Sequence, residues 1–204
     1  MFYDTNLNNH GLKFNPFKSC IVPRPIAFIS SMSTDGVINI APYSYFNAVA
    51  DTPPVIMFSS GYKADGTEKD TLRNIRSTHE FVVNITTYHL RNQMNLASTA
   101  LPYGISEAEQ FDIETLTSNI VKPPRVKLSP INLECKYIKT VELLVDSKSC
   151  SSQVVFGHVV GIHIDDSLII DNKIDITRLQ PIARLGSNQY AVVKEFFTMS
   201  KPKN

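Results

Sequence analysis

The sequence predicts a mainly β protein, an antiparallel barrel with a few peripheral helices. About seven or eight segments have the length and composition of strands, whereas only two longer segments have helical spacing. Most of the strands are joined by turns rather than by helices, which favours an antiparallel barrel over a doubly wound sheet. The 204 residues suit one domain, which we expect over residues 20–193, with a lead-in over 1–19 and a tail over 194–204.

The composition is that of a globular protein. Hydrophobic residues make up 43% of the chain and charged residues 19%, which argues against disorder. The net charge is +1 and no run of like charges occurs, so neither nucleic acid nor a membrane surface is an expected partner. No apolar run approaches the ~20 residues of a membrane span, and the first residues lack the features of a secretory signal. We therefore expect a cytoplasmic protein.

The cysteines do not indicate a disulfide framework or a metal site. Cys20, Cys135 and Cys150 are scattered, without the spacing of metal ligands. Reduced thiols are the expectation in a cytoplasmic protein. A zinc site would need four clustered ligands, and since none is visible we expect no metal.

The first predicted strands follow two prolines, Pro23 and Pro25, which force extended backbone. Residues 26–32 form an apolar strand, and residues 37–40 form its hairpin partner across the turn signal Asp35-Gly36. A third apolar strand covers residues 55–60.

Two helices are expected in the next part of the chain. The first covers residues 65–78, where Thr67 and Asp70 resemble a capping box. A strand over residues 81–86 separates it from the second helix, over 88–101.

Residues 103–130 are rich in loop formers and predict a long excursion. Its expected apolar anchors are Phe111, Ile113, Leu116 and Val121.

Strands follow over residues 131–145 and 153–165. On the second of these strands, alternation assigns His158 to the apolar face, so we expect a core or interface histidine. His163 shares the other face with Asp165, which suggests a pair at the rim. Residues 168–170 form a short strand, 175–179 one or two helical turns, and 183–193 the last segment of the domain.

Two polar clusters are candidates for a ligand site. Ser59 ends a strand and Lys69-Asp70-Thr71 lies at a helix start, where free N–H groups and the helix dipole favour an anion such as a phosphate. The alternative is an ordinary N-cap with a solvated lysine. Residues 39–47 place hydroxyl, amide and aromatic groups between buried strands, where each polar group needs a partner. A ligand or a bulge with a loop satisfies that need equally well.

Arg184 stands beside a predicted turn and is either a site residue or a surface arginine. No serine lies in a nucleophile elbow, and neither a Cys/His pair nor a carboxylate pair can be assembled. We therefore name no catalytic residue, and an enzyme of this sequence would take its reactive atoms from a cofactor.

Several short motifs follow one another in a fixed order along the chain. In order they are Arg24-Pro-Ile-Ala-Phe-Ile-Ser30, Asp35-Gly36, Asn39-Ile-Ala-Pro-Tyr-Ser-Tyr-Phe-Asn47, Pro53-Pro54, Lys69-Asp-Thr-Leu-Arg-Asn-Ile75, Glu80-Phe-Val-Val-Asn-Ile85, Glu134-Cys135, Gly157-His-Val-Val160 and Arg184-Leu-Gly186 with Tyr190. The set, over residues 20–193, resembles the flavin reductase-like, FMN-binding split-barrel proteins. The branch with these motifs contains flavoredoxin and the reductase component of nitrilotriacetate monooxygenase.

This resemblance implies an antiparallel, Greek-key-like split β-barrel that forms a homodimer and binds FMN non-covalently near the subunit interface. Three groups of residues are implied to contact the flavin. The isoalloxazine and ribityl chain would be lined by Ser30, Ser31, Asn39, Ala41, Tyr43, Ser44, Tyr45, Phe46 and Asn47. The phosphate would be held by Ser59, Lys69, Asp70 and Thr71, and Arg184 would lie close to the flavin.

The implied activity is that of an FMN-dependent oxidoreductase, in which NAD(P)H gives a hydride to N5 of FMN and the electrons pass to a monooxygenase or another acceptor. One motif departs from this pattern. Related small reductases often carry Gly-Asp-His before the late strand, whereas residues 149–153 here contain no histidine. A flavin-binding electron carrier or FMN-storage protein without a nicotinamide site is therefore an alternative. A barrel that binds no flavin and serves as an interaction module is another.

Overall fold

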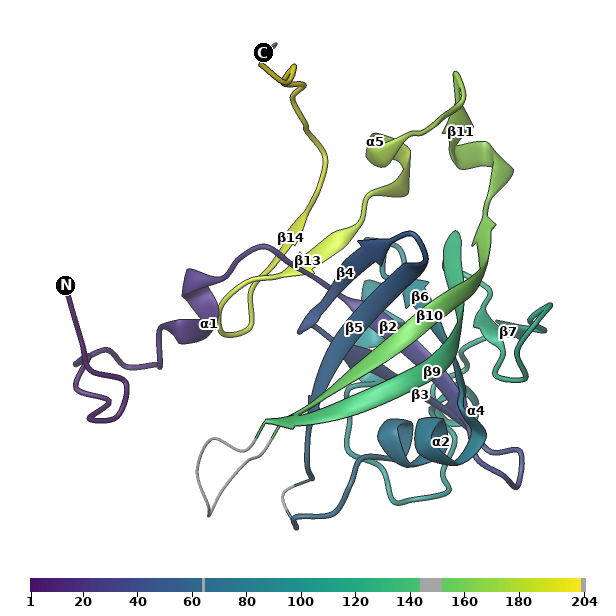
Figure 1. Cartoon of the computed structure of the whole chain (residues 1–204), viewed down its shortest axis with the longest axis horizontal. Coiled ribbons are helices and arrows are strands. Elements are labelled where there is room, and N and C mark those ends of the chain that lie inside the picture. Colours follow the sequence, from purple (N-terminus) through teal and green to yellow (C-terminus); the bar gives the residue numbers. More distant parts are fainter. Residues whose placement is uncertain (64, 144–151, 203–204) are drawn as a thin grey trace.

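The computed structural model describes residues 1–63, 65–143 and 152–202, and its centre is a seven-stranded, wholly antiparallel sheet (Figure 1). The strand order is β3-β2-β6-β9-β10-β5-β4. These strands are β2 (Ala27–Met32), β3 (Ile38–Tyr43), β4 (Phe46–Asp51), β5 (Pro54–Gly61), β6 (Glu80–Ile85), β9 (Ile131–Leu143) and β10 (Ser152–Ile164). The predicted mainly β, antiparallel architecture is confirmed.

Short elements surround this sheet. A three-stranded sheet has the order β1-β13-β14, and two small hairpins pair β7 with β8 and β11 with β12. Their bounds are β1 (Arg24–Pro25), β7 (Thr115–Leu116), β8 (Arg125–Val126), β11 (Ile169–Ile170), β12 (Lys173–Ile174), β13 (Ile182–Arg184) and β14 (Tyr190–Val192). The helices are α1 (Phe17–Cys20), α2 (Asp70–Thr78), α3 (Arg91–Leu96), α4 (Glu107–Gln110), α5 (Ile176–Leu179) and the 3-10 turn η1 (Asp166–Leu168).

The two edges of the large sheet are consecutive in the chain. β3 is one edge, β4 is the other, and only Ser44 and Tyr45 separate them. The curled sheet therefore brings its edges toward each other without hydrogen bonding between them, which leaves a barrel that is open along one side. The expected third strand corresponds to β5, whereas β4 is not among the predicted strands. Its first two residues belong to the polar stretch 39–47, which we expect to be either a ligand site or a bulge with a loop.

The first hairpin forms as the sequence predicts. β2 pairs with β3 in a register that places Ser31 opposite Asn39. Gly36 takes a positive φ of +86° in the connecting turn, a conformation that glycine adopts without steric cost.

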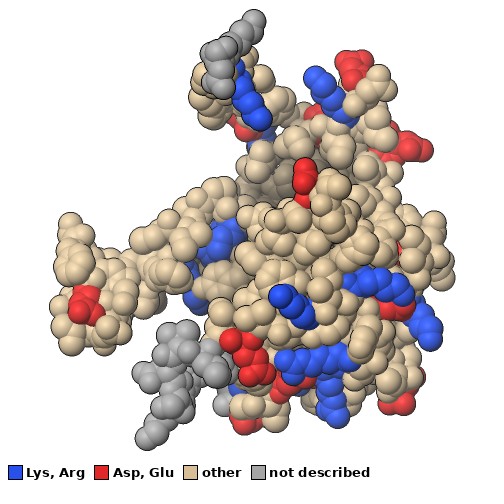
Figure 2. All heavy atoms as spheres, viewed as in Figure 1, with Lys and Arg blue, Asp and Glu red and all other residues tan. Residues whose placement is uncertain are grey.

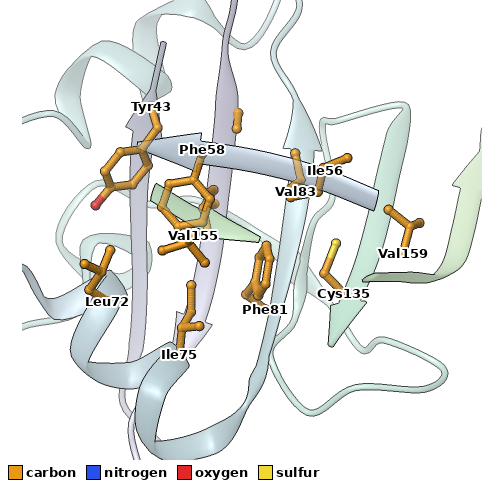
Figure 3. Packing of buried hydrophobic residues seen from close by; sticks show 12 residues of the cluster. Tyr43, Ile56, Phe58, Leu72, Ile75, Phe81, Val83, Cys135, Val155 and Val159 are labelled. Carbon is orange, nitrogen blue, oxygen red and sulfur yellow. The ribbon is translucent and has the colours of Figure 1, made fainter. Parts of the chain in front are cut away.

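The main core lies between the sheet and α2 (Figure 3). Leu72 and Ile75 of α2 point toward Phe58 and Phe81 on the strands, and all four side chains are at most 1% exposed. The ring centroids of Phe58 and Phe81 are 5.9 Å apart. Burial of each such side chain stabilises the fold by about 2 kcal/mol.

The buried face of β10 is the opposite of the one that we expected. Gln153, Val155 and Val159 are buried, whereas His158 and its face are only partly covered. The prediction of a core position for His158 is therefore wrong, because alternation alone cannot tell which of two apolar faces meets the core. An interface position for His158 stays a prediction.

The first helix begins later than expected, and the predicted capping box does not form. α2 starts at Asp70, with Lys69 as an N-cap residue that makes no side-chain cap. Thr67 instead donates its backbone N–H and its hydroxyl to Asp65, at 2.9 and 2.6 Å. The second helix is shorter than expected as well, since α3 covers only Arg91–Leu96.

The excursion over residues 103–130 is anchored as predicted by Ile113 and Val121, while Leu116 is 40% exposed. A buried carboxylate, for which the sequence analysis predicts no anchoring role, also holds this excursion in place. Glu134 of β9 accepts the backbone N–H groups of residues 119, 120 and 121, and it also pairs with His163 at 2.5 Å. The predicted rim pair of His163 with Asp165 is therefore wrong.

The terminal segments project from the barrel (Figure 1). Phe14 and Phe17 are more than half exposed, so these aromatic side chains of the lead-in do not pack on the domain. On the face shown in Figure 2, cationic and anionic side chains are interspersed. Among the described residues, no helix is long and apolar enough to cross a membrane, and no cluster of three or more potential metal ligands occurs.

Candidate functional site

A cleft of about 310 Å³ lies between β3 and the start of α2. Residues 97–101, which follow α3, and Glu107 of α4 complete its wall. The lining residues are Asn39, Ala41, Pro42, Tyr43, Lys63, Lys69, Asp70, Thr71, Ala97, Ser98, Thr99, Ala100, Leu101 and Glu107. The helix start that we expect to bind an anion and the polar second strand of the first hairpin thus meet in one place.

A buried hydrogen-bond network joins the strand to the helix. The Asn39 side-chain amide donates to the hydroxyls of Thr71 at 2.8 Å and Ser31 at 3.2 Å, and Asn74 also donates to Ser31 at 3.3 Å. All four residues are less than 9% exposed. The network fixes the relative position of the two cleft walls, because breaking it would leave buried polar groups without partners.

The cleft carries charges of both signs. Lys63 forms an ion pair with Asp70 at 2.6 Å, while the Lys69 ammonium lies 5.6 Å from the centre of the Tyr43 ring. Burial lowers the pKa of Lys69. With Asp70 neutralised by Lys63, the Lys69 ammonium is the available positive charge in the cleft that Thr71 also lines.

The Tyr43 hydroxyl lies near the hydroxyls of Thr71 and Ser60 but makes no hydrogen bond of ordinary geometry. The side chain is 5% exposed, and burial raises the pKa of its phenol to about 12. Since this oxygen is itself buried, it lies beneath the surface of the cleft, beside Thr71.

Glu107 is a cleft residue that the sequence did not suggest. It is 5% exposed, and its carboxylate accepts the backbone N–H of Ile40 at 2.9 Å. Burial raises the pKa of this carboxyl group. The sequence shows only an acidic residue within a loop-rich excursion, with no spacing that relates it to β3.

Six of the predicted site residues line the cleft together. They are Asn39, Ala41, Tyr43, Lys69, Asp70 and Thr71. Ser31 lies directly behind them in the hydrogen-bond network. Ser30 does not face the cleft, because successive residues of a strand point to opposite faces, and its hydroxyl bonds to the Pro124 carbonyl oxygen beneath the excursion.

A second group of predicted residues lies around Tyr45, outside the cleft. The Tyr45 carbonyl oxygen accepts the Ser59 N–H at 2.8 Å, and the Arg24 guanidinium lies 5.7 Å from the centre of the Tyr45 ring. Arg24 pairs in register with Arg184 across β1 and β13. Of the remaining predicted residues, Ser44 and Phe46 are partly buried, and Asn47 is exposed on β4.

The buried arginine of this group was missed as an anchor. Arg24 is 6% exposed and donates to the carbonyl oxygens of Lys18, Ile21 and Leu185, which ties α1 to the strand β13 region. Arg184 stacks on Tyr190, with 4.5 Å between the guanidinium and the ring centre. The two arginines thus border the Tyr45 side of the site.

Fold and cleft together describe an open antiparallel barrel with a polar, partly cationic cleft beside its edge strand β3. Residues 19–173 match the family model described as the flavin reductase like domain, and the chain belongs to this family.

Solved structures agree with this assignment. The chain is similar to nitrilotriacetate monooxygenase component B from Bacillus cereus, at 34% sequence identity and a TM-score of 0.88, with 98% of each chain covered. Two more distant structures share the fold. One is a Shewanella frigidimarina NCIMB 400 protein with a split barrel domain (18% identity, TM-score 0.84, 99% of this chain and 100% of that chain covered). The other is flavoredoxin of Desulfovibrio vulgaris (Miyazaki F), at 20% identity and a TM-score of 0.76, with 88% of this chain and 92% of that chain covered. The predicted split β-barrel is confirmed.

The residues present fit FMN, the cofactor that the family implies. An ammonium and a hydroxyl at the start of α2 suit a phosphate, as at many helix N-termini. The Glu107 carboxyl group, which also lines the cleft, suits a polar group of the ligand. A cleft of about 310 Å³ accommodates part of a ligand of this size, and Tyr45 outside it offers an aromatic surface.

Proposed function

We propose that the chain is an FMN-dependent oxidoreductase of the cytoplasm that accepts a hydride from NAD(P)H. The observation that carries the proposal is the meeting of Lys69, Thr71 and Tyr43 in one cleft of a flavin reductase-like chain. Bound FMN would supply the redox chemistry, since its N5 accepts a hydride.

The protein residues bind and orient the cofactor. Lys69 and Thr71 hold the phosphate end, while the Lys63–Asp70 ion pair keeps the Asp70 charge from opposing it. Asn39 fixes the Thr71 hydroxyl. Ser31 holds Asn39 from behind the cleft, and Ser30, which faces the excursion, is not among the contacts. The other proposed contacts, which include the Tyr45 side of the site, are Ala41, Tyr43, Ser44, Tyr45, Phe46, Asn47, Ser59 and Arg184. We assign no acid or base.

A flavin titration tests this assignment. FMN added to the purified chain should lose fluorescence on binding, and Lys69→Met and Thr71→Val should each weaken binding about tenfold, because each removes a phosphate contact. Lys127→Met is the matched control, since Lys127 pairs with Glu114 on the surface and should leave affinity unchanged. Failure of the wild-type chain to take up FMN would refute the proposal.

Whether NADH or NADPH reduces the bound flavin distinguishes a reductase from an electron carrier or storage protein. Anaerobic mixing with NADH or NADPH should bleach the bound flavin if the chain is a reductase. No bleaching with either nucleotide would favour a flavoredoxin-like electron carrier or an FMN-storage protein. The sequence feature behind this second candidate is the absence of histidine from residues 149–153, of which 149–151 lie outside the described residues. Family membership disfavours a barrel without flavin.

We also propose that two copies associate and that a monooxygenase or another acceptor takes the electrons. Support for a homodimer comes from exposed apolar side chains on the long strands, including Val141, Leu143 and Ile162. Light scattering of the protein as it elutes from a size-exclusion column tests the homodimer, and a molar mass equal to that of one chain would contradict it. The likeness to component B of a monooxygenase supports a separate acceptor protein.

A further inference from the structure

A second cavity, of about 380 Å³, lies between α3 and the β13–β14 hairpin. It is lined by Tyr88, Arg91, Asn92, Met94, Asn95, Ile182, Tyr190, Ala191 and Val192. None of these residues belongs to the candidate flavin cleft, which touches the α3 region only from Ala97 onward. The cavity therefore needs its own explanation.

Its floor is apolar and its walls are aromatic. Met94 and Ile182 are 3% and 5% exposed, so they form a floor that belongs to the core. Tyr88 and Tyr190 are both about 40% exposed and present their rings at the opening. A planar apolar ring would bury area against the floor and stack on either tyrosine.

The opening carries positive charge. The Arg91 guanidinium lies 3.9 Å from the centre of the Tyr88 ring, and the Lys194 ammonium lies 6.0 Å from the same ring. Arg184 stacks on Tyr190. No lining residue is acidic, and within the described part of the chain none of these three cations forms an ion pair.

Arg91 is the cation best placed to bind an anion in the cavity. Only one of its N–H groups is engaged among the described residues, with the Tyr88 carbonyl oxygen at 2.6 Å. The remaining donors of the guanidinium form a planar fork that matches a carboxylate. Arg184, by contrast, already donates to Tyr190 and to the Ser187 carbonyl oxygen.

We propose that this cavity is a second ligand site, which binds a planar aromatic carboxylate. The carboxylate pairs with Arg91 and the ring packs on Met94 and Ile182 beside the tyrosines. A neutral apolar ligand would leave the cations at the opening unneutralised, and a small inorganic anion would leave the apolar floor uncovered. The volume holds two fused rings.

Methionine methyl NMR locates the ligand. The chain has five methionines, and Met94 is the one that lines the cavity, so Met94→Leu assigns its signal. Naphthalene-2-carboxylate should shift the Met94 methyl resonance in a saturable way at submillimolar concentration. No saturable shift at millimolar concentration, or shifts confined to other methionines, would overturn the proposal. A second copy or the C-terminal tail seated in the cavity would produce that negative result.

Two comparisons test the chemistry. Arg91→Met should weaken binding about tenfold or more, because it removes a charge-assisted pair. Arg73→Met is the matched control, because Arg73 stacks on Tyr103 in the same way, 4.2 Å from the ring centre, but outside the cavity. Naphthalene-2-carboxamide, the neutral isostere, should bind at least about fivefold more weakly than the carboxylate. Equal affinity of acid and amide, or equal loss in both variants, would refute a carboxylate site at Arg91.

Discussion

The buried side chain of Asn84 should be among the most sensitive positions in the protein. It is fully buried on β6, and its amide donates to the Phe28 carbonyl oxygen at 2.8 Å and to the Ser30 hydroxyl at 3.2 Å. Its oxygen accepts the Val126 N–H and the Asn132 amide, both at 2.8 Å. One amide thus joins three strands of the large sheet to the excursion that carries Glu107.

Asn84→Val removes all four hydrogen bonds while it keeps a side chain suited to a strand. The Val126 N–H and the Asn132 amide lose a buried acceptor, and each unsatisfied group costs about 1–3 kcal/mol. Since neighbouring losses are not additive, we expect a decrease of about 3–5 kcal/mol in the free energy of unfolding. That is a large part of the about 5–15 kcal/mol typical of a domain.

Urea unfolding of the wild type and the variant measures this difference. Asn47→Val is the control, because Asn47 is exposed on β4 and should change stability by less than about 1 kcal/mol. Amide hydrogen exchange adds a local readout, since the Val126 N–H should lose protection before the strands do. A decrease below about 1 kcal/mol for Asn84→Val, with Val126 still protected, would refute the reasoning.

Three other predictions concern the core and two titrating groups. Gly157→Ala should lower the free energy of unfolding by about 1–3 kcal/mol, because a Cβ there would overlap Cζ of the Phe81 ring. Gly61→Ala is the control by the same urea assay and should be near neutral, because no atom of the described residues lies within 4 Å of a Cβ at that position. Burial opposes ionisation of Glu134, but hydrogen bonds from His163 and three amides more than offset it and lower its pKa from 4.5 to about 2. Its contribution to stability should therefore be full above pH 4.5 and be lost toward pH 2, and Glu134→Gln should abolish this dependence in acid unfolding; an unchanged dependence would contradict the assignment. Ultraviolet titration should show a tyrosine that ionises near pH 12 and that disappears in Tyr43→Phe, and its persistence in that variant would contradict the burial argument.

Local signals predicted most of the strands correctly. The turn at Asp35-Gly36 and the apolar runs that became β2, β5 and β6 are encoded within a few neighbouring residues. β4 was missed because most of its side chains are exposed at a sheet edge, so its sequence shows no alternation between buried and exposed residues.

The candidate site was only partly predictable, because its residues come from distant segments. The resemblance of the motifs implies that Asn39 and Thr71 belong to one site. In the structure the Asn39 side-chain amide donates to the Thr71 hydroxyl at 2.8 Å. Glu107 was not foreseen, since nothing local relates it to Ile40, its partner 67 residues earlier. The partner of His163 was missed for the same reason, because Glu134 lies on a neighbouring strand, 29 residues away in sequence.

The two-residue link between the edges of the large sheet sets a geometric limit. Three backbone steps separate the Cα atoms of Tyr43 and Phe46, so these atoms cannot be more than about 11 Å apart in any conformation. The aperture of the barrel at this point is thus bounded by bond lengths, whatever the flanking strands do. Tyr43 lines the cleft at the end of β3, so little of a ligand's binding free energy would be spent on restricting the motion of this end of β3 relative to β4.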